Sequence, residues 1–146
     1  MTCIAWDGKL LAADKLVISG YKRASFTKIR RIGDALVGFA GNTILTNAMF
    51  SWIEIGENPD KFPEAQRDKD NFTAGMKITL DGQIYLYENA PIPWLNERKI
   101  WAIGSGAEIA IGAMAAGASA EDAVKIACEW CYLTGGFSGG VDVLSF

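Results

Sequence analysis

The sequence predicts an α+β fold in which helices lie outside layers of antiparallel strands. Short apolar or β-branched runs occur in two blocks, one before residue 40 and one after residue 75, and a helical pattern separates the blocks. Asp-Gly pairs stand between neighbouring apolar runs, as they do in tight hairpins. The length of 146 residues fits one domain, and no repeat or linker divides the chain.

Five short strands are predicted in the first forty residues, and turn signals such as Asp7-Gly8 and Gly33-Asp34 separate them. These strands are Cys3–Trp6, Leu10–Ala13, Leu16–Ser19, Thr27–Ile32 and Ala35–Phe39. A helix is predicted over Asn42–Ile55, because apolar residues recur there with helical spacing behind Asn42, a residue type that caps helices.

The second half begins with the polar segment Gly56–Asn71, which we predict to be a solvated loop, with a short helix over Pro63–Lys69 as the alternative. Asp81-Gly82 joins the first two of the later strands in a second predicted hairpin. The later strands are Met76–Leu80, Gln83–Tyr87, Lys99–Ile103 and Gly140–Phe146. Two helices are predicted between the last two strands: Ala107–Ala116, and one that the capping-box pattern at Ser119 opens and that runs to about Tyr132.

Composition excludes several classes of function. Half of the residues are hydrophobic and 21% are charged, which is typical of a globular protein. The net charge is −3 and no basic stripe is present, so nucleic acid is not an expected partner. Glu108 and several glycines interrupt the most apolar stretch, so no membrane span is expected. The first residues do not form a secretory signal, and the three cysteines are an odd number, which together indicate free thiols in the cytoplasm.

The chain contains no histidine, which excludes catalytic triads, zinc sites and haem sites that depend on one. No metal or cofactor is therefore expected. Gly136–Gly140 matches the GxSxG pattern of a nucleophile elbow, but it precedes a strand and lacks a histidine partner, so a glycine-rich turn is favoured. Cys128 and Cys131 form a CxxC pattern near a helix end, where helix packing is favoured over zinc binding or redox chemistry. Gly104-Ser105-Gly106 at a helix start is by itself a weak indication of anion binding.

The N-terminus offers a nucleophile that needs no histidine. Thr2 follows Met1, and a small second residue allows an aminopeptidase to remove the methionine. The exposed α-amine would titrate near pH 8, at about 7.7–8.0, so that part of it is neutral at pH 7. It can then accept the proton of its own residue's hydroxyl, which places nucleophile and base in one residue.

Five segments in order carry a resemblance to a known family. They are Thr2–Ala5, Leu11–Asp14, Thr27–Ile32, Leu36–Gly41 and Ala102–Ala107. Together they resemble the proteasome β-subunit family, and most closely its bacterial HslV-type branch. The resemblance covers most of the chain and implies a four-layer αββα sandwich, the N-terminal nucleophile hydrolase fold. Because Gly56–Asn71 is short where the family has a long helix, we expect a reduced helix layer.

The resemblance also implies a catalytic set. Thr2 matches the nucleophile, Lys28 matches a lysine whose positive charge favours the neutral amine and the alkoxide, and Asp14 matches the acid that pairs with this lysine. Gly41 matches the residue whose backbone N–H forms the oxyanion hole. Ser105 matches a serine that hydrogen-bonds near the nucleophile's amine.

Two further matches concern the C-terminal turn and the specificity pocket. Ser138 matches a second supporting serine, and Gly135 stands where eukaryotic and archaeal members carry an aspartate. The implied specificity pocket is lined by Val17, Phe26, Arg30, Phe39 and Thr43. We expect this pocket to accept an apolar or aromatic residue, whereas an inward-pointing Arg30 would favour acidic residues instead.

The function that the resemblance implies is a threonine endopeptidase subunit of a self-compartmentalising, homo-oligomeric ring. Peptides or unfolded proteins would be the substrates, and an ATP-dependent unfoldase the partner. The alternative is a catalytically inactive assembly subunit that retains Met1. The presence of both Asp14 and Lys28 favours the peptidase, because a buried lysine without a catalytic role is costly.

Overall fold

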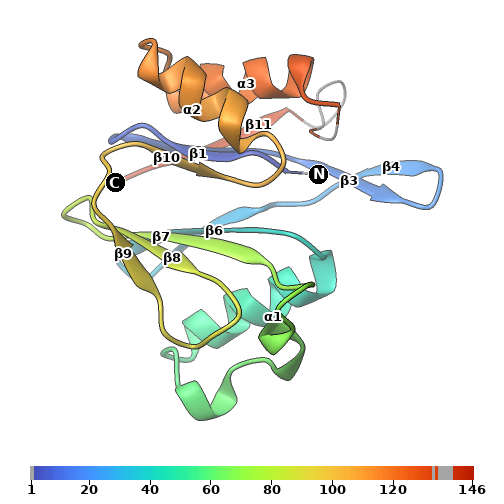
Figure 1. Ribbon diagram of the computed structural model, residues 1–146, viewed down its shortest axis with the longest axis vertical. Helices are drawn as coiled ribbons and strands as arrows, with labels where there is room; N and C mark the ends of the chain where they lie inside the picture. Colours follow the sequence, from blue (N-terminus) through green and yellow to red (C-terminus); the bar gives the residue numbers. More distant parts are fainter. Residues whose placement is uncertain (1, 133, 135–139) are drawn as a thin grey trace.

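Two antiparallel sheets stack face to face between helices in the computed structural model of the protein, which describes residues 2–132, 134 and 140–146 (Figure 1). One sheet has the strand order β10-β1-β2-β11 and the other the order β5-β6-β7-β8-β9. Helices α2 and α3 cover the outer face of the first sheet, and α1 covers the outer face of the second (Figure 1). The predicted four-layer αββα sandwich is confirmed.

The strands of the first sheet are β1 (Ile4–Trp6), β2 (Leu10–Asp14), β10 (Trp101–Ile103) and β11 (Val141–Ser145). Those of the second are β5 (Ile29–Ile32), β6 (Ala35–Ala40), β7 (Ala74–Ile78), β8 (Ile84–Tyr87) and β9 (Trp94–Asn96). The helices are α1 (Thr43–Glu54), α2 (Ala107–Ala115) and α3 (Ala120–Trp130). Within the described ranges, none of the helices has the length and apolar character needed to cross a membrane.

Alternation along the strands divides the core into layers. Ile4 and Trp6 of β1 face the second sheet, whereas Cys3 and Ala5 face α2 and α3. The helix-facing side of the first sheet carries mostly small residues, which lets α2 and α3 approach it closely. Burial on both faces explains why β1 has no polar residue in its sequence Ile-Ala-Trp.

The outer layer beneath the second sheet is reduced, as expected. Val37 and Phe39 of β6 pack there against aromatic residues of α1 such as Phe50 and Trp52. In the described part of the chain, α1 is the only α-helix on this face, and two short 3₁₀ helices follow it: η1 (Pro59–Lys61) and η2 (Glu64–Arg67). The predicted solvated loop therefore contains helical turns, and η2 falls within the alternative range Pro63–Lys69.

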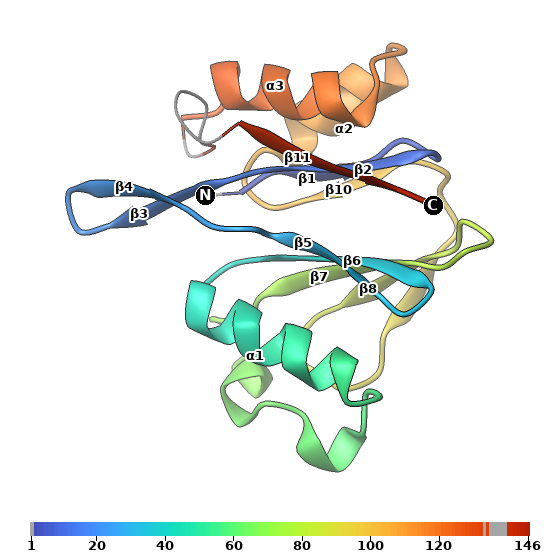
Figure 2. The ribbon, with the colours of Figure 1, turned by 180° about the vertical axis from the view of Figure 1, so that it is seen from behind.

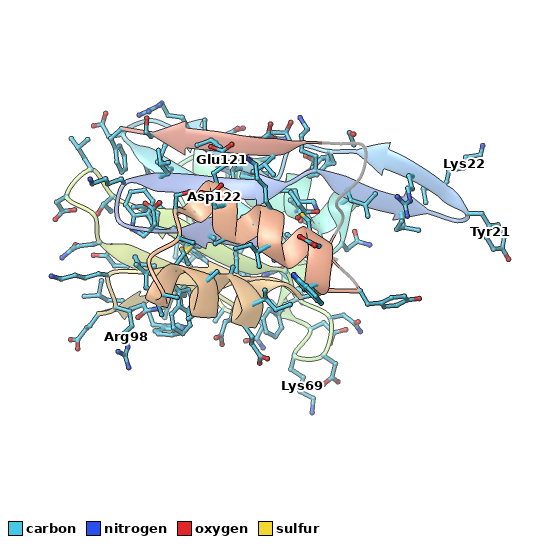
Figure 3. The ribbon with its side chains drawn as sticks, turned by 90° about the horizontal axis from the view of Figure 1, so that it is seen from above. Tyr21, Lys22, Lys69, Arg98, Glu121 and Asp122 are labelled. Atoms are coloured by element: carbon cyan, nitrogen blue, oxygen red, sulfur yellow. The ribbon has the colours of Figure 1, made fainter. Side chains whose placement is uncertain are left out.

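Two strands were not predicted. β4 (Lys22–Ser25) pairs with β3 (Leu16–Ser19) in a hairpin that projects beyond the two sheets (Figure 2). Seen from above, the labelled Tyr21 and Lys22 lie at the far tip of this hairpin (Figure 3). β9 pairs with β8 at the edge of the second sheet. Both strands are mainly exposed, so neither shows the buried alternation by which strands are recognised in a sequence.

Candidate active site

Thr2 lies just before β1 of the first sheet, and the segment that precedes α2 hydrogen-bonds to its backbone. The backbone N of Thr2 donates to Ser105 Oγ at 3.0 Å. The Gly106 N–H donates to the Thr2 carbonyl oxygen at 3.1 Å, and Ser105 Oγ donates to the same oxygen at 3.3 Å. Thr2 is 4% exposed, so its position is set by these contacts and by packing.

The glycines on either side of Ser105 are required by close packing. Gly104 has a φ of +94°, and a Cβ there would lie 2.3 Å from the Thr2 carbonyl oxygen. A Cβ at Gly106 would lie 2.7 Å from Thr134 Oγ1 and 2.8 Å from the Cβ of Cys3. The Gly-Ser-Gly segment therefore brings a serine hydroxyl to the backbone of Thr2 at a distance that no other residue type at positions 104 and 106 allows.

A buried ion pair lies beside Thr2. The Lys28 ammonium donates to Asp14 Oδ2 at 2.9 Å, and the two residues are 3% and 0% exposed. Asp14 also accepts from two backbone amides, that of Cys3 at 2.8 Å through Oδ1 and that of Leu16 at 3.2 Å through Oδ2. Because Cys3 follows Thr2 directly, one carboxylate positions both the lysine and the chain that carries Thr2.

Burial determines the ionisation behaviour around this pair. It lowers the pKa of Lys28, and the adjacent Asp14 carboxylate opposes part of that change. Burial, together with the nearby Asp14 carboxylate, raises the pKa of Cys128 to about 11. The pKa of Cys3 is also raised, chiefly by burial. Both thiols are un-ionised at neutral pH, so neither competes as a nucleophile.

A pocket of about 210 Å³ opens in front of Thr2. Residues from β3, from the segment between β4 and β5, and from the start of α1 line it: Thr2, Leu16, Val17, Ile18, Phe26, Lys28, Phe39, Gly41, Asn42, Thr43 and Thr46. Gly41 lies between β6 and α1 with a φ of +150°, a conformation that favours glycine. The side chain of Asn42 then caps α1 by accepting from the amides of Ile44 and Leu45. The structure thus brings Thr2, Lys28 and Gly41 to one pocket.

Four of the five residues proposed for the specificity pocket line this space, namely Val17, Phe26, Phe39 and Thr43, and Arg30 does not. The Arg30 guanidinium lies 4.2 Å from the ring centroid of Phe50. It also donates to Asn47 Oδ1 at 3.0 Å and lies 3.6 Å from the Glu54 carboxylate. The Arg30 side chain therefore contacts α1. Arg30 pairs with Val37 across β5 and β6, and the side chain of Val37 faces the same helix.

Ser138 and Gly135 lie outside the described residues. Sequence reasoning missed Thr134, which is 5% exposed and whose hydroxyl lies 3.4 Å from Ser105 Oγ. No signal in the sequence marks Thr134, because it precedes a glycine-rich segment and matches no motif. Among the residues that the structure describes, no group of His, Cys, Asp and Glu is arranged to hold a metal ion.

Comparison with known proteins finds similar structures but no similar sequences among curated proteins. No protein-family model matches the sequence, and no curated protein is significantly similar to it in sequence. The structure of HslV from Trypanosoma brucei is similar over 100% of both chains, with 22% identity and a TM-score of 0.69. BPH from Thiobacillus denitrificans in complex with epoxomicin is similar over 99% of this chain and 97% of its own, with 18% identity and a TM-score of 0.68. The chain has the HslV-like proteasome β-type fold.

Proposed function

We propose that the protein is a threonine endopeptidase in which Thr2, exposed by removal of Met1, is the N-terminal nucleophile. The observation that carries the proposal is the convergence of Thr2, Lys28 and Gly41 on one pocket, with Asp14 bonded both to Lys28 and to the amide next to Thr2. The similarity in fold to HslV supports it. The absence of histidine fits a mechanism in which an α-amine is the base.

In this mechanism the Thr2 amine accepts the proton of the Thr2 hydroxyl, and Oγ1 attacks the carbonyl carbon of the scissile peptide bond. The Lys28 cation stabilises the developing alkoxide, and Asp14 holds the ammonium in place. The Gly41 N–H donates to the oxyanion of the tetrahedral intermediate. The protonated amine then gives its proton to the leaving amine, which produces an ester on Thr2. Water, deprotonated by the same amine, hydrolyses that ester.

The pocket supports a preference for apolar or aromatic residues on the acyl side of the scissile bond. Val17, Phe26 and Phe39 give it an apolar wall. Burying a side chain against such a wall contributes roughly 1–3 kcal/mol. Arg30 contacts α1 and does not line the pocket, so its guanidinium does not provide the charge on which an acidic preference would depend. A fluorogenic peptide panel varied at this one position tests the preference, and faster cleavage after Glu or Asp than after Leu, Phe or Tyr would refute it.

We further propose that the subunits form a homo-oligomeric ring that encloses the sites and receives unfolded chains from an ATP-dependent unfoldase. Large apolar side chains are exposed at several places, among them Ile44 on α1 at 81% and Trp130 on α3 at 74%. Such side chains are candidates for burial between subunits, and closed cyclic symmetry is the simplest arrangement that hides the sites. A single monomeric species in light scattering at micromolar concentration would contradict the ring.

The test of the peptidase is hydrolysis of fluorogenic peptides by the Met1-free protein. Thr2→Ala should abolish turnover, because it removes the nucleophile, while Thr2→Ser should retain part of it. Lys28→Ala should abolish turnover and leave the oligomeric state unchanged. Wild-type rates in Thr2→Ala would show that another group performs the reaction.

A further inference from the structure

The loop between α1 and β7 contains two polar residues that are completely buried, Gln66 and Thr73. Gln66, in η2, is 0% exposed although the residues around it are mainly polar. Its Nε2 donates to the carbonyl oxygens of Thr73 and Glu88 at 2.7 and 2.8 Å. Its Oε1 accepts from the Thr73 amide at 2.9 Å and from the Thr73 hydroxyl at 3.0 Å. The amide therefore uses both of its donors and both acceptor positions, which offsets the cost of burying it.

Three of these four bonds are made to Thr73, and Thr73 packs against Gly41. A Cβ placed on Gly41 would lie 2.8 Å from the Thr73 methyl carbon and 3.1 Å from its Cα. The β6–β7 pairing ends at Ala40 and Ala74, so Thr73 and Gly41 are the next residues beyond the end of that ladder. Thr73 is 0% exposed and thus forms a wall behind Gly41. The chain of contacts runs from Gln66 through Thr73 to the turn that lines the Thr2 pocket.

We infer that Gln66 is a positioning residue that holds Thr73 against Gly41 and so fixes the direction of the Gly41 N–H. This inference rests on the proposed function, in which that N–H binds the oxyanion. Among the described residues, the layer beneath the second sheet consists of α1 and two 3₁₀ helices. The four hydrogen bonds of Gln66 make the segment behind Gly41 rigid, as the packing of a second long helix would.

An oxyanion donor acts on the transition state more than on the bound substrate, so displacing it lowers kcat more than it changes KM. Gln66→Met keeps the length of the side chain and removes all four bonds. We expect kcat to fall about 10- to 100-fold, with KM within about twofold of the wild type. The relaxation of the Thr73 methyl group, measured by NMR, should show a lower order parameter.

Glu57→Met is the matched control, because Glu57 holds the same loop at its other end. Its carboxylate binds the Lys77 ammonium at 2.7 Å and accepts from the Tyr87 hydroxyl. This variant should lose stability and keep kcat within about twofold, with an unchanged order parameter for the Thr73 methyl group. Wild-type kcat in Gln66→Met, or equal loss of kcat in both variants, would overturn the inference.

Two measurements keep the inference separate from folding and from the proposed function. If Gln66→Met does not fold, Thr73→Ser removes only the methyl group that packs on Gly41, and unchanged kcat in that variant overturns the inference. If the wild-type protein hydrolyses no peptide, the proposed function fails. The Thr73 methyl relaxation still reports whether Gln66 holds Thr73, and an unchanged order parameter in Gln66→Met refutes that step.

Discussion

Removing both partners of the Lys28–Asp14 pair should cost clearly less stability than the sum of the losses from removing each one alone. The two groups are 2.9 Å apart and almost completely buried, so Lys28→Met leaves an uncompensated carboxylate in the core. Breaking such a pair typically costs about 3–5 kcal/mol. Asp14 keeps two backbone donors, the amides of Cys3 and Leu16, so we expect the lower end, about 3 kcal/mol.

Asp14→Asn should cost at least as much. Among the described residues, the hydrogen-bond partners of the carboxylate are all donors: the amides of Cys3 and Leu16 and the ammonium of Lys28. The amide NH₂ of an asparagine must therefore face a donor, and the buried lysine loses its counter-charge. The double variant Lys28→Met with Asp14→Asn removes both charges. Its loss in free energy of unfolding should therefore be smaller than the sum of the two single losses by at least about 2 kcal/mol.

The assay is equilibrium unfolding in urea for the wild type, the two single variants and the double variant at one subunit concentration. Equal m-values across the set would show that the same surface is exposed on unfolding. Losses that add within about 0.5 kcal/mol would refute the reasoning, because they would mean that the two charges do not interact in the folded protein.

Three further outcomes follow from the site. The pH profile of kcat/KM should be bell-shaped. The rate should rise as the Thr2 amine loses its proton, at or below about pH 8 beside the Lys28 cation, and should fall again at a pH below 10.5, the ordinary pKa of lysine, because burial lowers the pKa of Lys28. A rate that does not fall by pH 10.5 would contradict the lysine's role. Gly104→Ala should lower Tm by roughly 4–10 °C through contact with the Thr2 carbonyl, whereas Gly112→Ala, with open space around its Cβ in α2, should not lower it. Cys128, with a pKa of about 11 against an ordinary 9.0, should react with iodoacetamide at pH 7.5 about a hundredfold more slowly than an unperturbed thiol, and equal rates would show that the thiol is not buried as described.

The layered fold could be predicted because several strands are short, mostly apolar runs bounded by turn signals. β1, β2 and β6 are buried on both faces, and Asp-Gly pairs mark two of the hairpins between neighbouring strands. β4 gave no such signal, because Lys22–Ser25 is exposed throughout. β9 follows Pro91 and Pro93, which indicate a loop, and it forms as an edge strand paired only with β8 on one side.

The candidate site was predictable only where a motif carried it. Thr2 was named from its place after Met1, whereas Asp14, Lys28, Gly41 and Ser105 were named from the family resemblance, since no spacing in the sequence shows that residues on separate strands converge. Arg30 was assigned to the pocket by the same resemblance, whereas its contacts with α1 depend on side-chain packing that the resemblance does not show.

Thr134 and Gln66 illustrate what the sequence does not reveal. Both are polar residues in polar or glycine-rich segments, where exposure is the ordinary expectation. Gln66 is buried because the loop folds back on the end of β7 and on Glu88, contacts between residues 7 and 22 positions apart. Such contacts leave no periodic trace in the sequence.

The central claim is that the hydroxyl of Thr2 is the nucleophile and its free amine the base, and intact-mass spectrometry tests it most directly. The protein is incubated with epoxomicin, the compound present in one of the similar structures, and its mass is measured alongside that of Thr2→Ala. We predict a chain that lacks Met1 and gains one epoxomicin, with the added mass located on Thr2 by fragmentation and absent from the variant. An active wild-type protein that retains Met1, or an adduct that persists in Thr2→Ala, would contradict the account.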